Sequence, residues 1–427
     1  MSAVDNIIIL SVDALRADHL GCYGYSRDTS PNIDKLAKDN AQFINAYSAS
    51  SHTREAVPSL LTGEYPDEAV SESYHLNTTT IAEHLQDEGY QTGGFHSNPY
   101  VSRAYGFNNG FDKFYDDLHL AQNKLIALAQ RALDKLRNRH YARASEINKK
   151  SLDWLDSLDS DQPFFLWNHY MDPHGPYEPI EEYRKQFHDE SVSDRKAQKL
   201  YKQAIKNPES VTDKEQEKLL NLYDAEIQYT DNYIEKFFDK LEDRGLISES
   251  LIILTSDHGD LFGEHGYYEH PRYPFKELVH IPLIIIHPSY TDLRVETPVS
   301  SIDIVSSVLN QYTGTEPAIP GHRLLPANPS PDQEIKRDIV YAQASTTDNG
   351  TLYRRFAAFN QDNWKMVEYE LVEEEVVASP PEPETSLERQ LIDHAEKRIG
   401  RKQLTDEKND SAAEEVNDRL EALGYKE

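Results

Sequence analysis

The sequence has almost no cysteine and no long apolar run. The single cysteine, Cys22, excludes an intrachain disulfide and a cysteine-based zinc site. The apolar runs, such as residues 7–10 and 283–286, have the length of strands and are too short to cross a bilayer, which excludes a membrane span. The N-terminus has no basic stretch ahead of its first apolar segment, so we expect no secretory signal and a cytoplasmic location.

Positive charge is scarce as well. The 427 residues include 44 Lys and Arg against 74 Asp and Glu, so the formal net charge is −30. This excess of carboxylates would repel a phosphate backbone, so we expect no nucleic-acid partner. The acidic residues are spread along the chain, which is typical of halophilic proteins, because such surfaces stay solvated in concentrated salt. An ordinary acidic cytosolic protein is the alternative.

The apolar residues predict a sheet with helices on both faces. Nearly every residue is apolar at 7–12, 164–167, 251–255 and 282–287. Helices are predicted at 32–38, 80–88, 118–136, 144–158 and 214–241. Continuous apolar strands that alternate with helices are typical of a mostly parallel sheet, so we predict a doubly wound α/β fold. The highly charged segment 180–215 is expected to be a surface excursion.

The character of the chain changes near residue 330. Proline-rich residues 319–329 lead into strands predicted near 339–342, 355–359 and 365–369, and a second proline-rich stretch precedes two acidic helical segments. We therefore predict a main α/β domain at 1–330 and a smaller α+β appendage at 331–427. The appendage could shape the entrance to a site or form an interface.

Polar residues directly follow three of the predicted strands. Asp13 ends the first strand, residues 168–174 follow the second, and Asp257 and His258 follow the third. Ligands of open α/β sheets collect at the carboxyl ends of the strands, and carboxylate with imidazole suits a hard divalent cation. The alternative, in which Asp257 caps a turn and His258 is a surface residue, is weaker because three such junctions share one edge.

A stretch rich in hydroxyl groups leads into another helical segment. Residues 50–53 are polar, and the helical pattern that follows them closes on Gly63. A hydroxyl at a helix start lies near free amide hydrogens and the positive end of the helix dipole, which stabilise an oxyanion. Thr53 and Ser51 are therefore candidate nucleophiles, although Ser and Thr also cap helices for purely structural reasons.

Together these motifs resemble the sulfatase family of the alkaline-phosphatase superfamily. The similar segments are 13–24, 30–37, 43–48, 59–63, 171–177, 223–227, 256–266 and 280–283, in the order found in that family. The resemblance implies that 1–330 is the catalytic domain. It also implies that Asp13, Asp257 and His258, together with the nucleophile Thr53, bind one divalent cation, which could be Ca, Mg or Mn.

The resemblance implies further roles around that cation. His174 would contact the ester oxygens of a small anionic substrate, and His270 would face the transferred group. His96 and Asn98 lie where many relatives have a Lys/His pair, so we expect them to bind substrate. Arg54 could pair with the substrate anion, and its alternative is a solvated surface arginine.

Two departures from the family pattern affect the chemistry. Ala14 stands where relatives often have a second Asp, so the metal loses a possible ligand. Thr53 stands in place of the cysteine that sulfatases convert to formylglycine, and Glu55 and Val57 replace the Pro and Arg of that motif. A sulfated threonine would have to be released by direct attack of water, whereas a threonine alkoxide suits phosphoryl chemistry.

The sequence thus predicts a metal-dependent, sulfatase-like hydrolase of a sulfate or phosphate ester. The threonine favours a phosphoester, by hydrolysis or by transfer to an acceptor. The alternative is a catalytically silent protein with a sulfatase fold that binds a partner or serves as a scaffold.

Overall fold

The computed structural model describes residues 5–118, 141–159, 162–187, 192–314, 318–324, 337–401 and 416. The helix predicted at 118–136 and the last acidic helical segment lie outside these residues, apart from single positions. No helix in the described ranges is long and apolar enough to cross a membrane.

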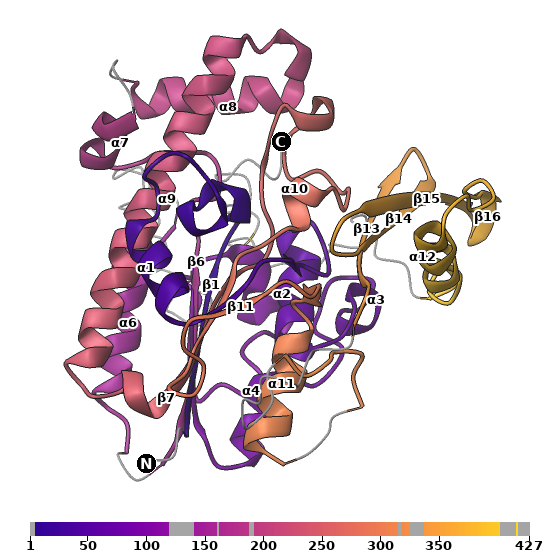
Figure 1. The fold of residues 1–427 in the computed structure, drawn as a ribbon. Coiled ribbons are helices and arrows are strands. Elements are labelled where there is room, and N and C mark those ends of the chain that lie inside the picture. The colour runs from indigo at the N-terminus through magenta and orange to yellow at the C-terminus, as the bar shows by residue number, and fades with distance from the viewer. Residues whose placement is uncertain are drawn as a thin grey trace, which may run out of the picture.

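A mixed eight-stranded sheet forms the centre of the molecule (Figure 1). From edge to edge its strands are β11 (Leu293–Val295), β2 (Ala41–Phe43), β10 (Leu283–Ile286), β7 (Ser250–Ser256), β1 (Asn6–Val12), β6 (Phe164–Tyr170), β4 (Gln91–Phe95) and β5 (Lys113–Tyr115). β1 pairs in parallel with β6 and β7, whereas β10 runs antiparallel to both of its neighbours. The mostly parallel α/β fold is confirmed.

Helices cover both faces of this sheet (Figure 1). One face carries α1 (Pro31–Asp39), α6 (Ala144–Leu155) and α9 (Asp213–Glu242), and the other carries α2 (Thr53–Thr62), α4 (Ile81–Asp87) and α11 (Asp303–Tyr312). In β1, Ile8 and Leu10 belong to the first core, and Ile7 and Ile9 belong to the second. Burial on both sides explains why this strand is apolar at consecutive positions.

The charged segment 180–215 is mostly exposed, as expected, and most of it is helical. It forms α7 (Glu181–Phe187) and α8 (Asp194–Lys206), which contact α9. Leu200, Tyr201 and Ala204 of α8 are buried, so apolar residues at helical spacing anchor one face of a helix that is otherwise charged.

A four-stranded antiparallel sheet follows the main sheet in sequence and packs beside α10 (Lys276–Val279) (Figure 1). It consists of β13 (Val340–Asp348), β14 (Thr351–Phe359), β15 (Trp364–Val372) and β16 (Glu375–Ala378), with α12 (Ser386–Glu396) against it. The three strands predicted here exist and are longer than expected. Val340 and Phe359 share a hydrophobic cluster with Tyr47 and Phe275, and the division at residue 330 stays a prediction.

The described chain also contains one short α-helix and several short strands outside the layers above. They are α3 (Pro66–Ala69), β3 (Ala46–Tyr47), β8 (Leu261–Phe262), β9 (Tyr268–Glu269) and β12 (Val299–Ser300).

Candidate active site

The carboxyl ends of β1 and β7 bring three predicted metal ligands together. The ligand atoms of Asp13, Asp257 and His258 lie within 4.8 Å of one another, and all three residues are buried. His258 Nε2 is 3.7 Å from Asp13 Oδ1 and 3.6 Å from Asp257 Oδ2. Burial excludes the alternative in which His258 is a surface residue.

The hydrogen bonds of Asp13 and Asp257 leave one oxygen of each carboxylate available to bind a cation. Asp13 Oδ2 accepts from Asn98 Nδ2 at 2.6 Å, and Asp257 Oδ1 accepts from the backbone N–H groups of Ala14 at 3.1 Å and His258 at 2.8 Å. Asp13 Oδ1 and Asp257 Oδ2 are buried and have no hydrogen-bond partner among the described residues. Two bare carboxylate oxygens beside an imidazole nitrogen fit a hard divalent cation.

The electrostatics of this pair also fit a cation. Burial, and then the negative charge of Asp13, raise the pKa of Asp257. Burial opposes ionisation of Asp13 too, but the charge of His174, together with the neighbouring His169 ring, holds the pKa of Asp13 well below its usual range. A buried carboxylate pair of this kind would be stabilised by a positive charge between its open oxygens.

Ala14 takes part in the site only through its backbone. Its φ of 57° is left-handed, and its carbonyl oxygen accepts from Tyr223 Oη at 2.6 Å. Its N–H donates to Asp257, as described above. The methyl side chain offers no ligand, as expected from the departure at this position.

Thr53 is the first residue of α2 and lies against the cluster of Asp13, Asp257 and His258. Its Oγ1 lies 3.0 Å from His258 Nε2. His258 Nδ1 is 3.0 Å from the carbonyl oxygen of Gly259, so Nδ1 carries the hydrogen and Nε2 is the acceptor. The helix cap is His52, whose side chain accepts from the backbone N–H of Arg54, so Thr53 is not there as a cap. Ser51 Oγ instead donates to the carbonyl oxygen of Pro271 at 3.3 Å.

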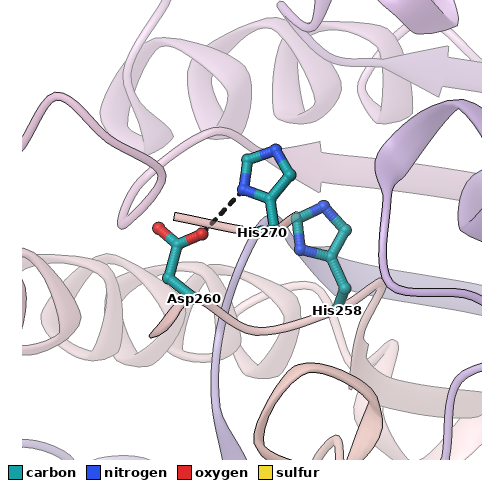
Figure 2. Close-up of side chains that lie close together, drawn as sticks. All are labelled: His258, Asp260 and His270. Atoms are coloured by element: carbon teal, nitrogen blue, oxygen red, sulfur yellow. Dashed lines mark hydrogen bonds and ion pairs between the residues drawn. The ribbon is translucent and has the colours of Figure 1, made fainter. Parts of the chain in front are cut away.

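Two further predicted histidines lie beside this group. The ring of His270 is 4.5 Å from the ring of His258 and 5.0 Å from that of His174, measured between centroids. His270 Nδ1 donates to Asp260 Oδ1 at 2.7 Å (Figure 2). The other oxygen of Asp260 accepts from Tyr177 Oη at 2.7 Å.

His258, Asp260 and His270 form a second group with metal-ligand spacing. Both oxygens of Asp260 already accept hydrogen bonds, and His258 is shared with the first group. The first group, with its two bare oxygens, is therefore the better cation site. Asp260 and His270 form a hydrogen-bonded pair.

The two histidines differ in their tendency to hold a proton. Burial lowers the pKa of His270 to about 4. Burial also acts against a charged His174, but Asp13 and Asp260 outweigh it and raise the pKa of His174. Neighbouring groups with pKa values moved apart are the usual arrangement of an acid and a base in an active site.

Comparison with known proteins identifies the family. The Sulfatase family model matches residues 5–314. The chain belongs to the sulfatase family. It is 26% identical over 359 residues to the uncharacterized sulfatase YidJ of Escherichia coli (strain K12), covering 75% of this chain and 70% of that one. It is 24% identical over 336 residues to an arylsulfatase of Clostridium perfringens (strain 13 / Type A), covering 66% of this chain and 68% of that one.

Solved structures agree with the fold. The phosphonate monoester hydrolase of Agrobacterium radiobacter superposes with a TM-score of 0.66 at 18% identity, covering 92% of this chain and 94% of that chain. A putative sulfatase yidJ from Bacteroides fragilis superposes with a TM-score of 0.68 at 18% identity, covering 93% and 97%. At 18% identity these superpositions show a shared fold and nothing about activity.

The three residues predicted to bind substrate in this sulfatase-family protein lie in three different environments. Arg54 is not a solvated surface residue, because it is buried and its guanidinium lies 3.6 Å from the ring centroid of Tyr74. Asn98 binds the carboxylate of Asp13. His96 is buried with its ring against Phe114 and Trp167, and its role in substrate binding stays a prediction.

Sequence reasoning missed an ion pair at the start of α2. Arg272 Nη1 lies 2.5 Å from Glu55 Oε1, and Ser50 Oγ donates to Glu55 Oε2 at 2.7 Å. In the sequence Glu55 stands out only as a replacement for the family's proline, and Arg272 lies 217 positions further on, so the spacing of these residues gives no signal. Asp260, two residues after His258, could have been assigned from its place in the same loop.

Proposed function

We propose that this sulfatase-family protein is a metal-dependent hydrolase of small anionic phosphoesters, with Thr53 as the nucleophile. The observation that carries the proposal is the 3.0 Å contact between Thr53 Oγ1 and His258 Nε2, beside the bare oxygens of Asp13 and Asp257. The fold shared with a phosphonate monoester hydrolase is consistent with phosphorus chemistry.

A divalent cation held by Asp13, Asp257 and His258 would supply a Lewis acid that lowers the pKa of a nearby hydroxyl and offsets charge on the ester oxygens. Thr53 loses its hydroxyl proton to solvent, and Oγ1 forms a bond to phosphorus while the bond from phosphorus to the alcohol oxygen breaks. The N-terminus of α2 and the guanidinium of Arg54 add positive potential for an anionic substrate.

His174 is suited to protonate the departing alcohol oxygen. Its raised pKa favours the protonated ring. Its Nδ1 lies 2.6 Å from the carbonyl oxygen of Gly175, so the proton for the leaving group would come from Nε2.

His270 is suited to the second half of the reaction. Asp260 accepts its Nδ1 hydrogen, and the lowered pKa keeps the ring neutral, so Nε2 can accept a proton from water. The water oxygen then bonds to phosphorus and the bond from phosphorus to Thr53 breaks. The proton that His270 took from water passes to Thr53 Oγ1, which restores the threonine hydroxyl, and His174 takes up a proton from solvent.

The threonine itself argues for phosphorus over sulfur. A formylglycine hydrate expels sulfate by deprotonation of its second hydroxyl, and threonine has no such group. A phosphorylated threonine can be released by in-line attack of water, which is the step assigned above to His270.

The test compares matched aryl esters with the full chain in concentrated KCl. Aryl phosphate, aryl phosphonate monoester, aryl phosphodiester and aryl sulfate are each supplied with Mn²⁺, Mg²⁺, Ca²⁺ or EDTA. We expect cation-dependent cleavage of a phosphorus ester, a loss of at least about 10³-fold in Thr53→Val, and retained activity in Thr53→Ser. Ser51→Ala is the matched control, since this hydroxyl is bound to the backbone of Pro271.

Other outcomes would overturn the proposal. Activity that survives Thr53→Val would show a different nucleophile, and a preference for aryl sulfate would refute the phosphoester. Cation binding without turnover of any ester would favour the catalytically silent alternative.

A further inference from the structure

A buried histidine outside the proposed ligands lies against Asp13. His169 is on β6, directly across from Ser11 on β1, and both side chains are fully buried. Its Nε2 is 3.3 Å from Asp13 Oδ2, the oxygen that accepts from Asn98. Among the described residues this nitrogen has no hydrogen bond of regular geometry, and the 3.3 Å approach to Asp13 is the polar contact that it makes. His169 therefore directs its one open polar atom at the inner oxygen of Asp13.

A hydrogen-bond chain decides which nitrogen of His169 carries the hydrogen. Trp167 Nε1 donates to Ser11 Oγ at 3.0 Å, and Ser11 Oγ lies 2.9 Å from His169 Nδ1. Ser11 can then donate its own hydrogen to Nδ1, which leaves the ring hydrogen on Nε2. The opposite tautomer would place a nitrogen lone pair against the carboxylate of Asp13, which is repulsive.

The ring itself is held in place. Trp167 and His169 stack with centroids 5.8 Å apart and an interplanar angle of 25°. Trp167 is itself fully buried, within the middle of the sheet. The orientation of Nε2–H is therefore built into the core and does not depend on a surface loop.

We propose that His169 is a positioning residue for the cation site, which together with Asn98 fixes Asp13 Oδ2 so that Oδ1 faces His258 and Asp257. The inference rests on the proposed cation site and adds a residue to it. Partners that orient a ligand in this way typically change metal affinity by about 10–100-fold when they are removed.

The test measures Mn²⁺ binding to the full chain by titration calorimetry, so it does not depend on knowing the substrate. His169→Gln can still place an N–H near the position of Nε2, whereas His169→Asn reaches only the position of Nδ1 and His169→Leu has no donor. We expect Mn²⁺ affinity to fall about 10–100-fold in the Asn and Leu variants and to stay within a few-fold in the Gln variant.

The controls separate positioning from folding. His394→Leu removes a histidine that is also stacked on an aromatic ring, Tyr341, in the C-terminal sheet and helix, and it should leave Mn²⁺ affinity unchanged. Thermal unfolding in EDTA reports whether each variant is folded, and if His169→Leu is not, the contrast between Asn and Gln decides.

Each outcome is decisive. Wild-type affinity in the folded Asn and Leu variants would overturn the role of His169 and leave the cation site intact. Equal loss in Gln and Asn would also overturn it, because the donor would not be what matters. A wild-type protein that binds none of Mn²⁺, Mg²⁺ and Ca²⁺ would overturn the site and the positioning role together.

Discussion

Arg355 on β14 donates from Nη1 to the backbone carbonyl oxygen of Arg272 at 2.8 Å. Its Nη2 donates to Tyr273 Oη at 3.1 Å, and its guanidinium lies 3.7 Å from the centroid of that ring. The loop held in this way carries His270, whose ring lies 4.5 Å from that of His258, the residue in contact with Thr53 Oγ1. The contact favours a role for the C-terminal sheet in shaping the site, one of the two roles that the sequence left open.

Arg355→Met should therefore slow the reaction without unfolding the protein. The loop at 270–273 would lose two hydrogen bonds, and a displacement of about 1 Å in a catalytic group can cost up to about 10²-fold in rate. We expect kcat to fall at least about tenfold, with a smaller change in KM. Steady-state kinetics with the best aryl ester checks this.

Arg354→Met is the matched control for that variant. Arg354 is the neighbouring buried arginine, and its guanidinium binds the carbonyl oxygens of Arg398 and Ile399 instead of the loop. A similar loss of thermal stability is expected, with kcat unchanged. Equal losses of kcat in both variants would mean that Arg355 supports the fold and not the loop.

Substitutions of Glu55 and Arg272, which form an ion pair, should have strongly non-additive effects on the free energy of unfolding. Only 1% of the Glu55 side chain and 12% of the Arg272 side chain are exposed, so Arg272→Met leaves a buried carboxylate without its cation. We expect a loss of about 3–5 kcal/mol in the free energy of unfolding. Glu55→Gln with Arg272→Met should recover most of it, because the amide is neutral.

Urea titration of the two single variants and the double variant measures this coupling. Additive effects would show that the two side chains contribute independently, contrary to the geometry.

The sequence predicted the strands of the main sheet that are apolar at consecutive positions, and it missed the others, among them β4. β1, β6, β7 and β10 are apolar at consecutive positions because both faces are covered. β4 contains Gly93 and Gly94 and was not predicted. A Cβ at Gly93 would lie 2.8 Å from the ring of Trp154, so this strand depends on close approach of its backbone, which carries no hydrophobic signal.

The sequence predicted those site residues that directly follow a strand. It did not predict the contacts that form where distant segments of the chain come together. Asp13, Asp257 and His258 were placed together because parallel strands share an edge. Arg272 and Glu55 meet only because the loop after β9 folds over α2, and no local pattern reports that contact. The hydrogen bond from Asn98 to Asp13 likewise depends on how the chain turns after β4.

The carboxylate pair predicts a cation-dependent stability. Asp257→Asn keeps an oxygen for the N–H groups of Ala14 and His258 and removes one of two neighbouring charges. In EDTA this variant should unfold at a higher temperature than the wild type, because the repulsion from Asp13 is relieved.

Divalent cation should stabilise only the wild type, by roughly 2.7 kcal/mol at 100 times the dissociation constant. Thermal unfolding with EDTA or added Mn²⁺ measures both effects. A variant that is destabilised in EDTA and still responds to Mn²⁺ would contradict the proposed ligand set.

The lowered pKa of His394 predicts that this residue makes the protein less stable in acid. Burial, and then the positive charges of Arg398 and Lys397, lower its pKa to about 3, against an ordinary value of 6.5. The unfolded chain therefore binds a proton first as the pH falls below about 6.5, so this residue costs stability between that pH and about 3. At pH 5 the cost is up to ~2 kcal/mol.

His394→Phe removes this titration and can keep the stack on Tyr341, whose ring is 3.9 Å away with an interplanar angle of 6°. We expect the free energy of unfolding to fall less between pH 7.5 and pH 5 in the variant than in the wild type, by up to ~2 kcal/mol. The other buried histidines titrate alike in both proteins and cancel in this difference. An equal fall in both would mean that His394 is already protonated in the folded state at pH 5, despite the surrounding arginines.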